Sequence, residues 1–287
     1  MTPDQYCGEK AAPAGSSLRY SLLWVPPPER AAVLAVHALR HELREAAVEV
    51  SDPGVAAAKL GWWREELDRL DQGTPRHPVT QALQAARGNF DLRGEYLQEI
   101  LEGAETDLEQ SRFESFKDLS LYCHRLSGSA GVLCAEIFGY EDHHTPRYAH
   151  ALAVALQLTR IIRNVRSDAM RGRWYVPLEE LQRFALRPAD LAHPQTADRA
   201  RDLFRFQVER ARSYFQKALS QLPERDRFAQ RAGLAMAAIY RTLLDEIERD
   251  GYRLLEHRIE LTPLRKMWLA WRTVRRERRR HPARKSA

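Results

Sequence analysis

Cysteine is scarce in this chain, and its three cysteines lie far apart. Cys7, Cys123 and Cys134 form no Cys-x-x-Cys pair, which argues against a disulfide framework and for a reducing compartment. No run of 18 apolar residues occurs, so no transmembrane helix is expected. The N-terminus carries Asp4 and Glu9 and lacks the basic patch and apolar run of a signal peptide. We therefore expect a cytoplasmic protein.

Alternating β-branched segments are also few, so we expect strands to be nearly absent. Apolar residues make up 44% of the chain, which is enough for a large core, and no Pro- or Gly/Ser-rich linker divides it. Apolar residues recur at three- and four-residue steps, the pattern of amphipathic helices. These segments cover residues 29–50, 55–70, 78–87, 92–102, 116–128, 146–167, 200–222, 228–249 and 263–279. The sequence predicts an all-α, single-domain bundle of eight or more helices.

Positive charge is concentrated at the C-terminus. The formal net charge is +6, but ten Lys and Arg residues stand against the single Glu277 from residue 265 onward. The rest of the chain is therefore slightly acidic, and its overall basicity says nothing about the core. We divide the sequence into a helical domain over residues 1–270 and a basic tail over residues 271–287.

The segment around residue 270 combines aromatic and basic side chains. Trp268 and Trp271 lie at helical spacing, with Arg272, Arg275 and Arg276 beside them. A basic amphipathic helix with tryptophans is typical of contact with an anionic membrane surface, so we expect peripheral binding to the inner face of the membrane. In the alternative interpretation, the tryptophans pack on the bundle and only a solvated tail follows. No nucleic-acid-reading motif accompanies these charges, and nucleic acid is not expected as a partner.

Five sequence blocks follow one another in a recognisable order. They are GSSLRYS at 15–21, KLGWWREEL at 59–67, GAETDL at 103–108, LYCHRLSGSAG at 121–131 and QLTRIIRNVRSDAMRGRWYVP at 157–177. Together they resemble the squalene/phytoene synthase family. The resemblance implies an isoprenoid-synthase-type bundle with a central cavity for an isoprenoid diphosphate or lipid. Family enzymes join two prenyl diphosphates head to head, with Mg²⁺ held by aspartates on two facing helices.

The two aspartate-rich segments depart from the family pattern. Where the first has three aspartates, this chain has Arg44, Glu45 and Val48, and the second retains only Asn164 and Asp168. The resemblance leaves Asn164, Asp168 and Glu45 as remnants of a metal site, and it implies Mg²⁺ only if the chain is an active enzyme. No other cofactor is expected. The alternative is a polar helix face on which neighbouring arginines satisfy Asn164 and Asp168.

Positions that contact substrate in the family are better preserved. By resemblance they are Ser17, Tyr20, Tyr122, Arg125, Arg171, Arg173 and Tyr175. Arginine binds phosphate oxygens bidentately, so the three arginines could hold an anion without a metal. The alternatives are an ion-pair network with Glu45, Glu49 and Asp168, and tyrosines that belong to the core.

Two functions remain open at this point. The altered aspartate segments favour a non-catalytic homologue that binds a lipid or a protein partner at the membrane, similar to a respiratory-complex assembly factor built on the same family. The alternative is a working squalene- or phytoene-type prenyltransferase. The intact Arg-Gly-Arg element at residues 171–173 argues for the second function, because it indicates a preserved pocket.

Overall fold

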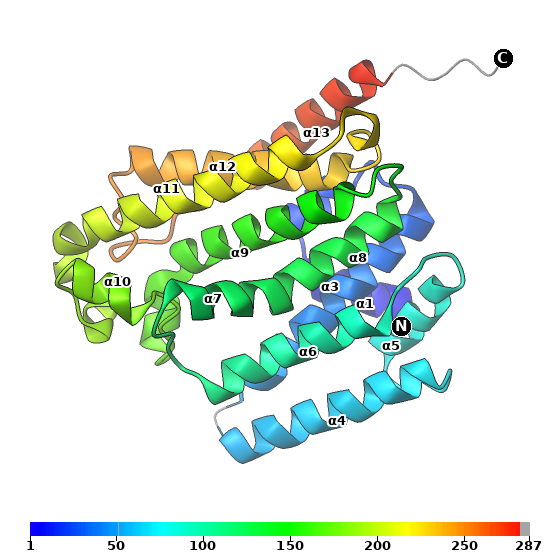
Figure 1. Cartoon of the computed structure of the whole chain (residues 1–287), viewed down its shortest axis with the longest axis horizontal. Coiled ribbons are helices and arrows are strands. Elements are labelled where there is room, and N and C mark those ends of the chain that lie inside the picture. Colours follow the sequence, from blue (N-terminus) through cyan, green and yellow to red (C-terminus); the bar gives the residue numbers. More distant parts are fainter. Residues whose placement is uncertain (51, 282–287) are drawn as a thin grey trace.

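The computed structural model describes residues 1–50 and 52–281, and within these residues the chain is a bundle of helices (Figure 1). No strand forms there, and the β-type contact is an isolated bridge between Arg112 and Trp174. The prediction of an all-α, single-domain bundle is confirmed.

The helices of the first half are α1 (Pro3–Ala11), α2 (Ser17–Ser21), α3 (Pro27–Val48), α4 (Pro53–Asp71), α5 (Pro78–Arg87), α6 (Gly94–Glu109), α7 (Phe116–Cys123), the π-helical turn η1 (His124–Gly128) and α8 (Ser129–Phe138). Those of the second half are α9 (Thr145–Met170), α10 (Leu178–Arg183), η2 (Pro188–Ala192), η3 (Pro194–Thr196), α11 (Ala197–Gln221), η4 (Glu224–Asp226), α12 (Arg231–Arg249) and α13 (Pro263–Arg280). The turns η2, η3 and η4 are 3₁₀.

Proline marks the start of several helices whose bounds the sequence predicted closely. It occupies the first turn of α3, α4, α5 and α13, where its missing N–H costs nothing and its fixed φ suits the helix. Three of these starts are also capped: Asp52 accepts from two backbone N–H groups of α4, His77 accepts from Val79 N of α5, and Thr262 accepts from Arg265 N. Caps of this kind satisfy donors that the helix itself leaves free.

Four helices, α1, α2, α8 and α10, were missed by the periodicity argument. The clearest case is α8, whose residues are apolar on nearly every side and are mostly buried. A helix that is buried all round shows no apolar stripe, so its sequence carries little periodic signal. It continues directly from α7 through η1, and the three form one long rod.

The long helix α9 lies at the centre of the bundle, with α11 and α8 packed against it (Figure 1). Helix α8 approaches it at Gly131, where an added Cβ would lie 2.6 Å from Ala153 Cβ and 2.7 Å from Ala149 O. Glycine is therefore needed for this close contact. Helix α3 packs on α8, and α12 packs on α9, so that α3, α8, α9 and α12 form the walls of the bundle's interior.

The predicted boundary at residue 270 falls inside one continuous helix. Helix α13 runs from Pro263 to Arg280 and packs along α12. Its buried side includes Ala270, Thr273, Val274 and Glu277, and Arg227 pairs with Glu277 at 2.9 Å. Residues 271–280 are thus part of the helical domain, whereas the last part of the predicted tail, residues 282–287, lies outside the described residues.

Candidate active site

An apolar cavity lies between α2, α3, α8, α9 and α12. Its walls include the side chains of Leu22, Val33, Phe138, Leu152, Leu156 and Met236. The cavity volume is about 140 Å³, close to that of an engineered cavity that binds benzene.

One end of the cavity is polar and is formed by α3 and α9. Gln157 Oε1 accepts a hydrogen bond from Arg40 Nη2 at 2.9 Å and another from Arg160 Nε at 3.1 Å. Gln157 is only 1% exposed. Its Nε2 group and the Nε group of Arg40 are buried and have no hydrogen-bond partner. The cavity therefore ends in donors that are available to an acceptor.

The charge at this end is positive, and no carboxylate pairs directly with it in the described residues. Among the described residues, no ion pair within 4.0 Å involves Arg40, Arg44 or Arg160. Burial and the nearby Arg160 lower the pKa of Arg40 to about 10. Burial and Arg40 also lower the pKa of His37, another cavity residue, to about 3, so His37 is neutral near pH 7. The positive charge of the cavity thus comes from arginine alone.

Two of the predicted metal remnants contact basic side chains. Asn164 Oδ1 accepts from Arg163 Nε at 3.1 Å, as the polar-face alternative predicted. Glu45 is bound by Lys10 of α1. That Glu45 shares a metal with Asn164 and Asp168 stays a prediction.

Asp168 is the remaining carboxylate of the second segment. It is buried, and its pKa is raised by burial, although Arg160, Arg44 and Arg171 oppose the shift. Mg²⁺ favours several oxygen ligands, usually including carboxylates. One carboxylate among arginines does not fit the ion that the family resemblance implies, and we derive no step through Mg²⁺.

Two of the predicted tyrosines meet at a carboxylate that the sequence argument did not single out. Tyr122 donates to Asp107 Oδ2 at 2.8 Å, and Tyr175 donates to Asp107 Oδ1 at 2.6 Å. All three residues are buried. Burial and the charge of Asp107 raise the pKa of both tyrosines. Asp107 lies within the GAETDL block, but spacing gave no sign of this contact.

The predicted anion-binding arginines lie elsewhere than the cavity lining. Arg173 donates to the backbone oxygens of Asp107 and Ala47, and so joins the end of α9 to α6 and α3. Arg125 lies 3.6 Å from Glu102. Arg171 is exposed just after α9. None of the three pairs with Glu45, Glu49 or Asp168 within the described residues, so the predicted ion-pair network is wrong.

Ser17 and Tyr20 are both on α2, beside the cavity. Ser17 lines a smaller space together with Arg163, Tyr240 and Lys266, and Tyr240 also borders the main cavity. Tyr20 is partly buried and packs against the core. Neither residue therefore lines the main cavity.

The residues that sequence reasoning missed are Arg40, Gln157 and Arg160. Gln157 and Arg160 lie in the block at 157–177, whereas Arg40 lies outside the five blocks. The sequence did carry a signal for these residues, because Arg40 and Arg160 are charged residues on otherwise apolar helix faces.

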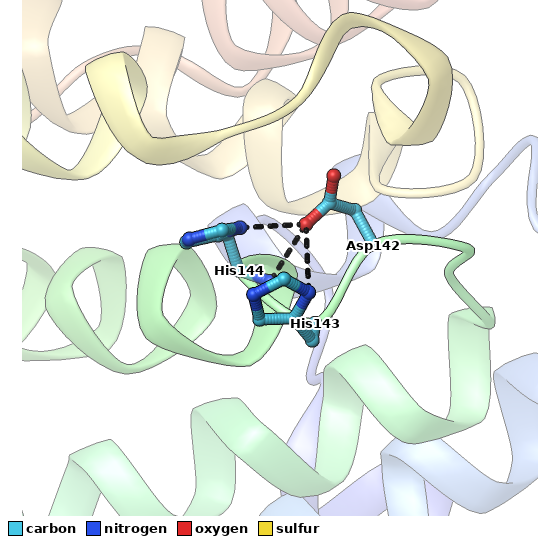
Figure 2. A group of neighbouring side chains, drawn as sticks. All are labelled: Asp142, His143 and His144. Carbon is cyan, nitrogen blue, oxygen red and sulfur yellow. Dashed lines mark hydrogen bonds and ion pairs between the residues drawn. The ribbon is translucent and has the colours of Figure 1, made fainter.

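A second cluster of polar side chains lies in the loop before α9 (Figure 2). The carboxylate of Asp142 lies 2.8 Å from His144 Nδ1 and 3.7 Å from His143 Nδ1. It also accepts from His144 N and pairs with Arg225. Both histidines are exposed. Because Asp142 is already satisfied by the helix start and by an arginine, the cluster serves to fix this loop.

The outer face of α13 is aromatic and basic. Trp268 is 48% exposed and Trp271 is 42% exposed, so the alternative in which they pack on the bundle is wrong. The guanidinium of Arg272 lies 5.1 Å from the Trp268 ring centre, and that of Arg275 lies 5.1 Å from the Trp271 ring. Arg276 instead pairs with Glu277 at 3.1 Å. Within the described residues, no helix is both long and apolar enough to cross a membrane.

Two phytoene synthases are similar in sequence to this chain over most of its length. A 15-cis-phytoene synthase from Synechococcus elongatus is 32% identical over 276 residues, which cover 91% of this chain and 89% of that protein. A phytoene synthase from Mycobacterium tuberculosis is 33% identical over 260 residues, covering 90% of this chain and 85% of that one.

Solved structures share the fold. A dehydrosqualene synthase crystallised with a ligand matches with a TM-score of 0.80 at 23% identity, covering 94% of this chain and 95% of that chain. A squalene synthase from Alicyclobacillus acidocaldarius matches with a TM-score of 0.74 at 25% identity, covering 87% and 94%. The family model described as squalene/phytoene synthase matches residues 11–265. The motifs, the helical bundle and these matches agree, and the chain belongs to the squalene/phytoene synthase family.

Proposed function

We propose that this protein acts on isoprenoid diphosphates as a prenyltransferase of the squalene or phytoene synthase type. The observation that carries the proposal is an apolar cavity that ends in unpaired donors of Arg40 and Gln157, next to Arg160. An isoprenoid diphosphate has the matching chemistry, an apolar chain with an anionic head. The similarity to two phytoene synthases over about nine-tenths of the chain supports the same function.

The cavity suits the chemistry of such a transfer. The C1–O bond of one allylic diphosphate breaks, and its electron pair leaves with the diphosphate oxygen. Positive charge fixed beside that oxygen stabilises the developing anion. The double bond of a second chain then attacks C1 and forms the new C–C bond, and the carbocation that this attack leaves on the second chain loses a proton to the released diphosphate. The apolar walls formed by residues such as Leu152 and Phe138 exclude water, which would otherwise capture the carbocation.

Release of inorganic diphosphate tests the proposal. Purified protein is given farnesyl or geranylgeranyl diphosphate, with and without Mg²⁺, in the presence of NADPH. We expect release above that of a heat-denatured control, together with a condensed hydrocarbon or alcohol product in an organic extract. A folded protein that binds the substrates but releases no diphosphate would contradict the enzymatic function.

A second candidate function, binding without catalysis, is favoured by one specific observation. Arg44, Val48 and Asn164 occupy positions at which the family resemblance implies aspartates, and the contacts of Glu45 are with α1. In that case, the cavity holds an isoprenoid or another lipid for a protein partner. Failure to release diphosphate, combined with retention of an isoprenoid through purification, would support this candidate.

We also propose that α13 holds the protein on an anionic membrane surface. Leu264, Met267, Trp268 and Trp271 form an exposed face on this helix, and Arg272 and Arg275 stack on the two indole rings. Tryptophan favours the membrane interface and arginine favours anionic head groups. Helix α12, on which α13 packs, also lines the cavity.

Binding to vesicles tests the membrane proposal. We expect the double variant Trp268→Ala/Trp271→Ala to bind vesicles of phosphatidylcholine with phosphatidylglycerol at least about tenfold more weakly than the wild type, because two interfacial anchors are lost. The matched control is Trp62→Ala on α4. Trp62 is 41% exposed and also stacks with an arginine, Arg69. Equal loss in the control, or no loss in the double variant, would contradict a specific membrane face.

A further inference from the structure

We infer that Arg40, Gln157 and Arg160, with Arg44 one turn farther along α3, form a metal-independent clamp for the diphosphate group. The inference deepens the proposed function and rests on it for the identity of the ligand. In this clamp, guanidinium groups supply the positive charge. By the family resemblance, Mg²⁺ would supply that charge instead.

These partly buried arginines have no carboxylate in direct contact, and two of them carry buried donor atoms without a partner. Arg40 and Arg44 each have a buried Nε with no partner, and no carboxylate in the described residues pairs with either side chain or with Arg160. Burying a charge without a partner is costly. A protein keeps such a group where a ligand supplies the missing charge, and an anion in the cavity would do so.

The guanidinium groups of Arg40 and Arg160 come together at Gln157. Arg40 on α3 and Arg160 on α9 donate to the same oxygen of Gln157, so the two guanidinium groups converge from opposite walls. Residues 40 and 44 are four apart on α3 and share one face of the helix. Diphosphate has two phosphoryl groups, and each can accept a pair of N–H donors from one arginine. Gln157 Nε2, which has no partner, supplies a further donor.

The side chains around Asp168 suit an anion better than a divalent metal ion. Asp168 is the single carboxylate left in the second segment, and Arg44 and Arg160 are among the charges that act on it. Asn164 already accepts from Arg163. A divalent ion placed here would meet positive charge from two helices, whereas a diphosphate would meet donors.

The clamp is tested by calorimetric titration of inorganic diphosphate in EDTA. We expect the wild type to bind under these conditions, and monophosphate to bind more weakly. Arg40→Gln and Arg160→Gln should each weaken binding about 10- to 100-fold, the effect of losing one charged hydrogen bond. The matched control is Arg212→Gln on α11, whose arginine pairs with Asp245 and Glu248 at the surface, and its affinity should be unchanged.

Thermal unfolding separates a ligand clamp from a structural role. Without ligand, Arg40→Met should melt at the wild-type temperature or above it, because an uncompensated buried charge has been removed. Diphosphate should raise the melting temperature of the wild type but not that of this variant. A large drop in the melting temperature of ligand-free Arg40→Met would mean that Arg40 stabilises the fold, and would overturn the inference.

Arg160→Lys keeps the positive charge but loses the planar, paired N–H donors of the guanidinium group. This variant should bind diphosphate more weakly than the wild type and remain folded.

Asp168→Asn distinguishes the clamp from a metal site. We expect this variant to bind diphosphate in EDTA as tightly as the wild type, or more tightly. If wild-type binding requires Mg²⁺ and is lost in Asp168→Asn, the clamp is wrong, although the proposed transferase function could still hold. If diphosphate binds in EDTA but prenyl diphosphates are never turned over, the clamp holds and the proposed function fails.

Discussion

Replacing Asp107 by alanine should destabilise the protein by roughly 3 kcal/mol, because two buried hydroxyl groups lose their acceptor. Tyr122 and Tyr175 approach Asp107 from α7 and from the segment after α9, at 2.8 and 2.6 Å. Neither hydroxyl has another hydrogen-bond acceptor within the described residues. The expected result is a lower urea midpoint with an unchanged m value, measured by circular dichroism.

The single variants of the tyrosines provide the comparison for Asp107. Tyr175→Phe removes one donor and leaves Asp107 bonded to Tyr122, so its cost should be about half as large. Tyr122→Phe should behave in the same way. A loss of less than about 1 kcal/mol in Asp107→Ala would show that water or a neighbouring group satisfies the hydroxyls. Because the negative charge of Asp107 also acts on Arg160, its removal leaves more net positive charge beside that arginine, and the alanine variant should bind diphosphate as tightly as the wild type or more tightly.

Replacing Glu66 by glutamine should remove an acid-sensitive contribution of about 3 kcal/mol to stability. Glu66 is fully buried on α4. Its carboxylate accepts from Arg76 N at 2.7 Å, His77 N at 2.8 Å and Arg69 Nε at 2.8 Å, and also from the Thr80 hydroxyl. Burial raises the pKa of this group, but the four hydrogen bonds outweigh burial and lower it from 4.5 to about 2.

The direction of this shift sets the pH window. Because the folded pKa is below the ordinary value of 4.5, the contribution of Glu66 is fully present above about pH 4.5 and is lost as pH falls toward about 2. The difference between wild type and Glu66→Gln, measured by urea unfolding, should therefore be constant near neutral pH and shrink in acid. The matched control is Glu65→Gln, whose exposed carboxylate lies 3.5 Å from Arg69. A difference that stays constant down to about pH 3 would contradict this assignment.

The two interior acids differ from the arginines in the partners that the fold gives them. Asp107 and Glu66 are each surrounded by donors from other segments, so their burial is compensated within the fold. Arg40, Arg44 and Arg160 are partly buried, and among the described residues no carboxylate lies within 4.0 Å of their guanidinium nitrogens. This difference is why we assign the carboxylates to stability and the arginines to a ligand.

The sequence by itself determined the helical class, most helix positions and the family. The spacing of apolar residues is a local property, so segments such as 78–87 and 263–280 could be predicted closely. The altered residues at positions 44, 48 and 164 could likewise be read directly. The prediction that Trp268 and Trp271 share an outward helix face also followed from their spacing, and both side chains are exposed on α13.

Only the tertiary structure decided which side chains meet. Arg40 and Gln157 are 117 positions apart, and their contact depends on how α3 and α9 are rotated about their axes within the bundle. Helical periodicity shows which face of a helix is buried, but it does not show what that face will contact. For the same reason, the sequence placed Arg125, Arg171 and Arg173 at the substrate, whereas the folded chain brings Arg40 and Arg160 to the end of the cavity.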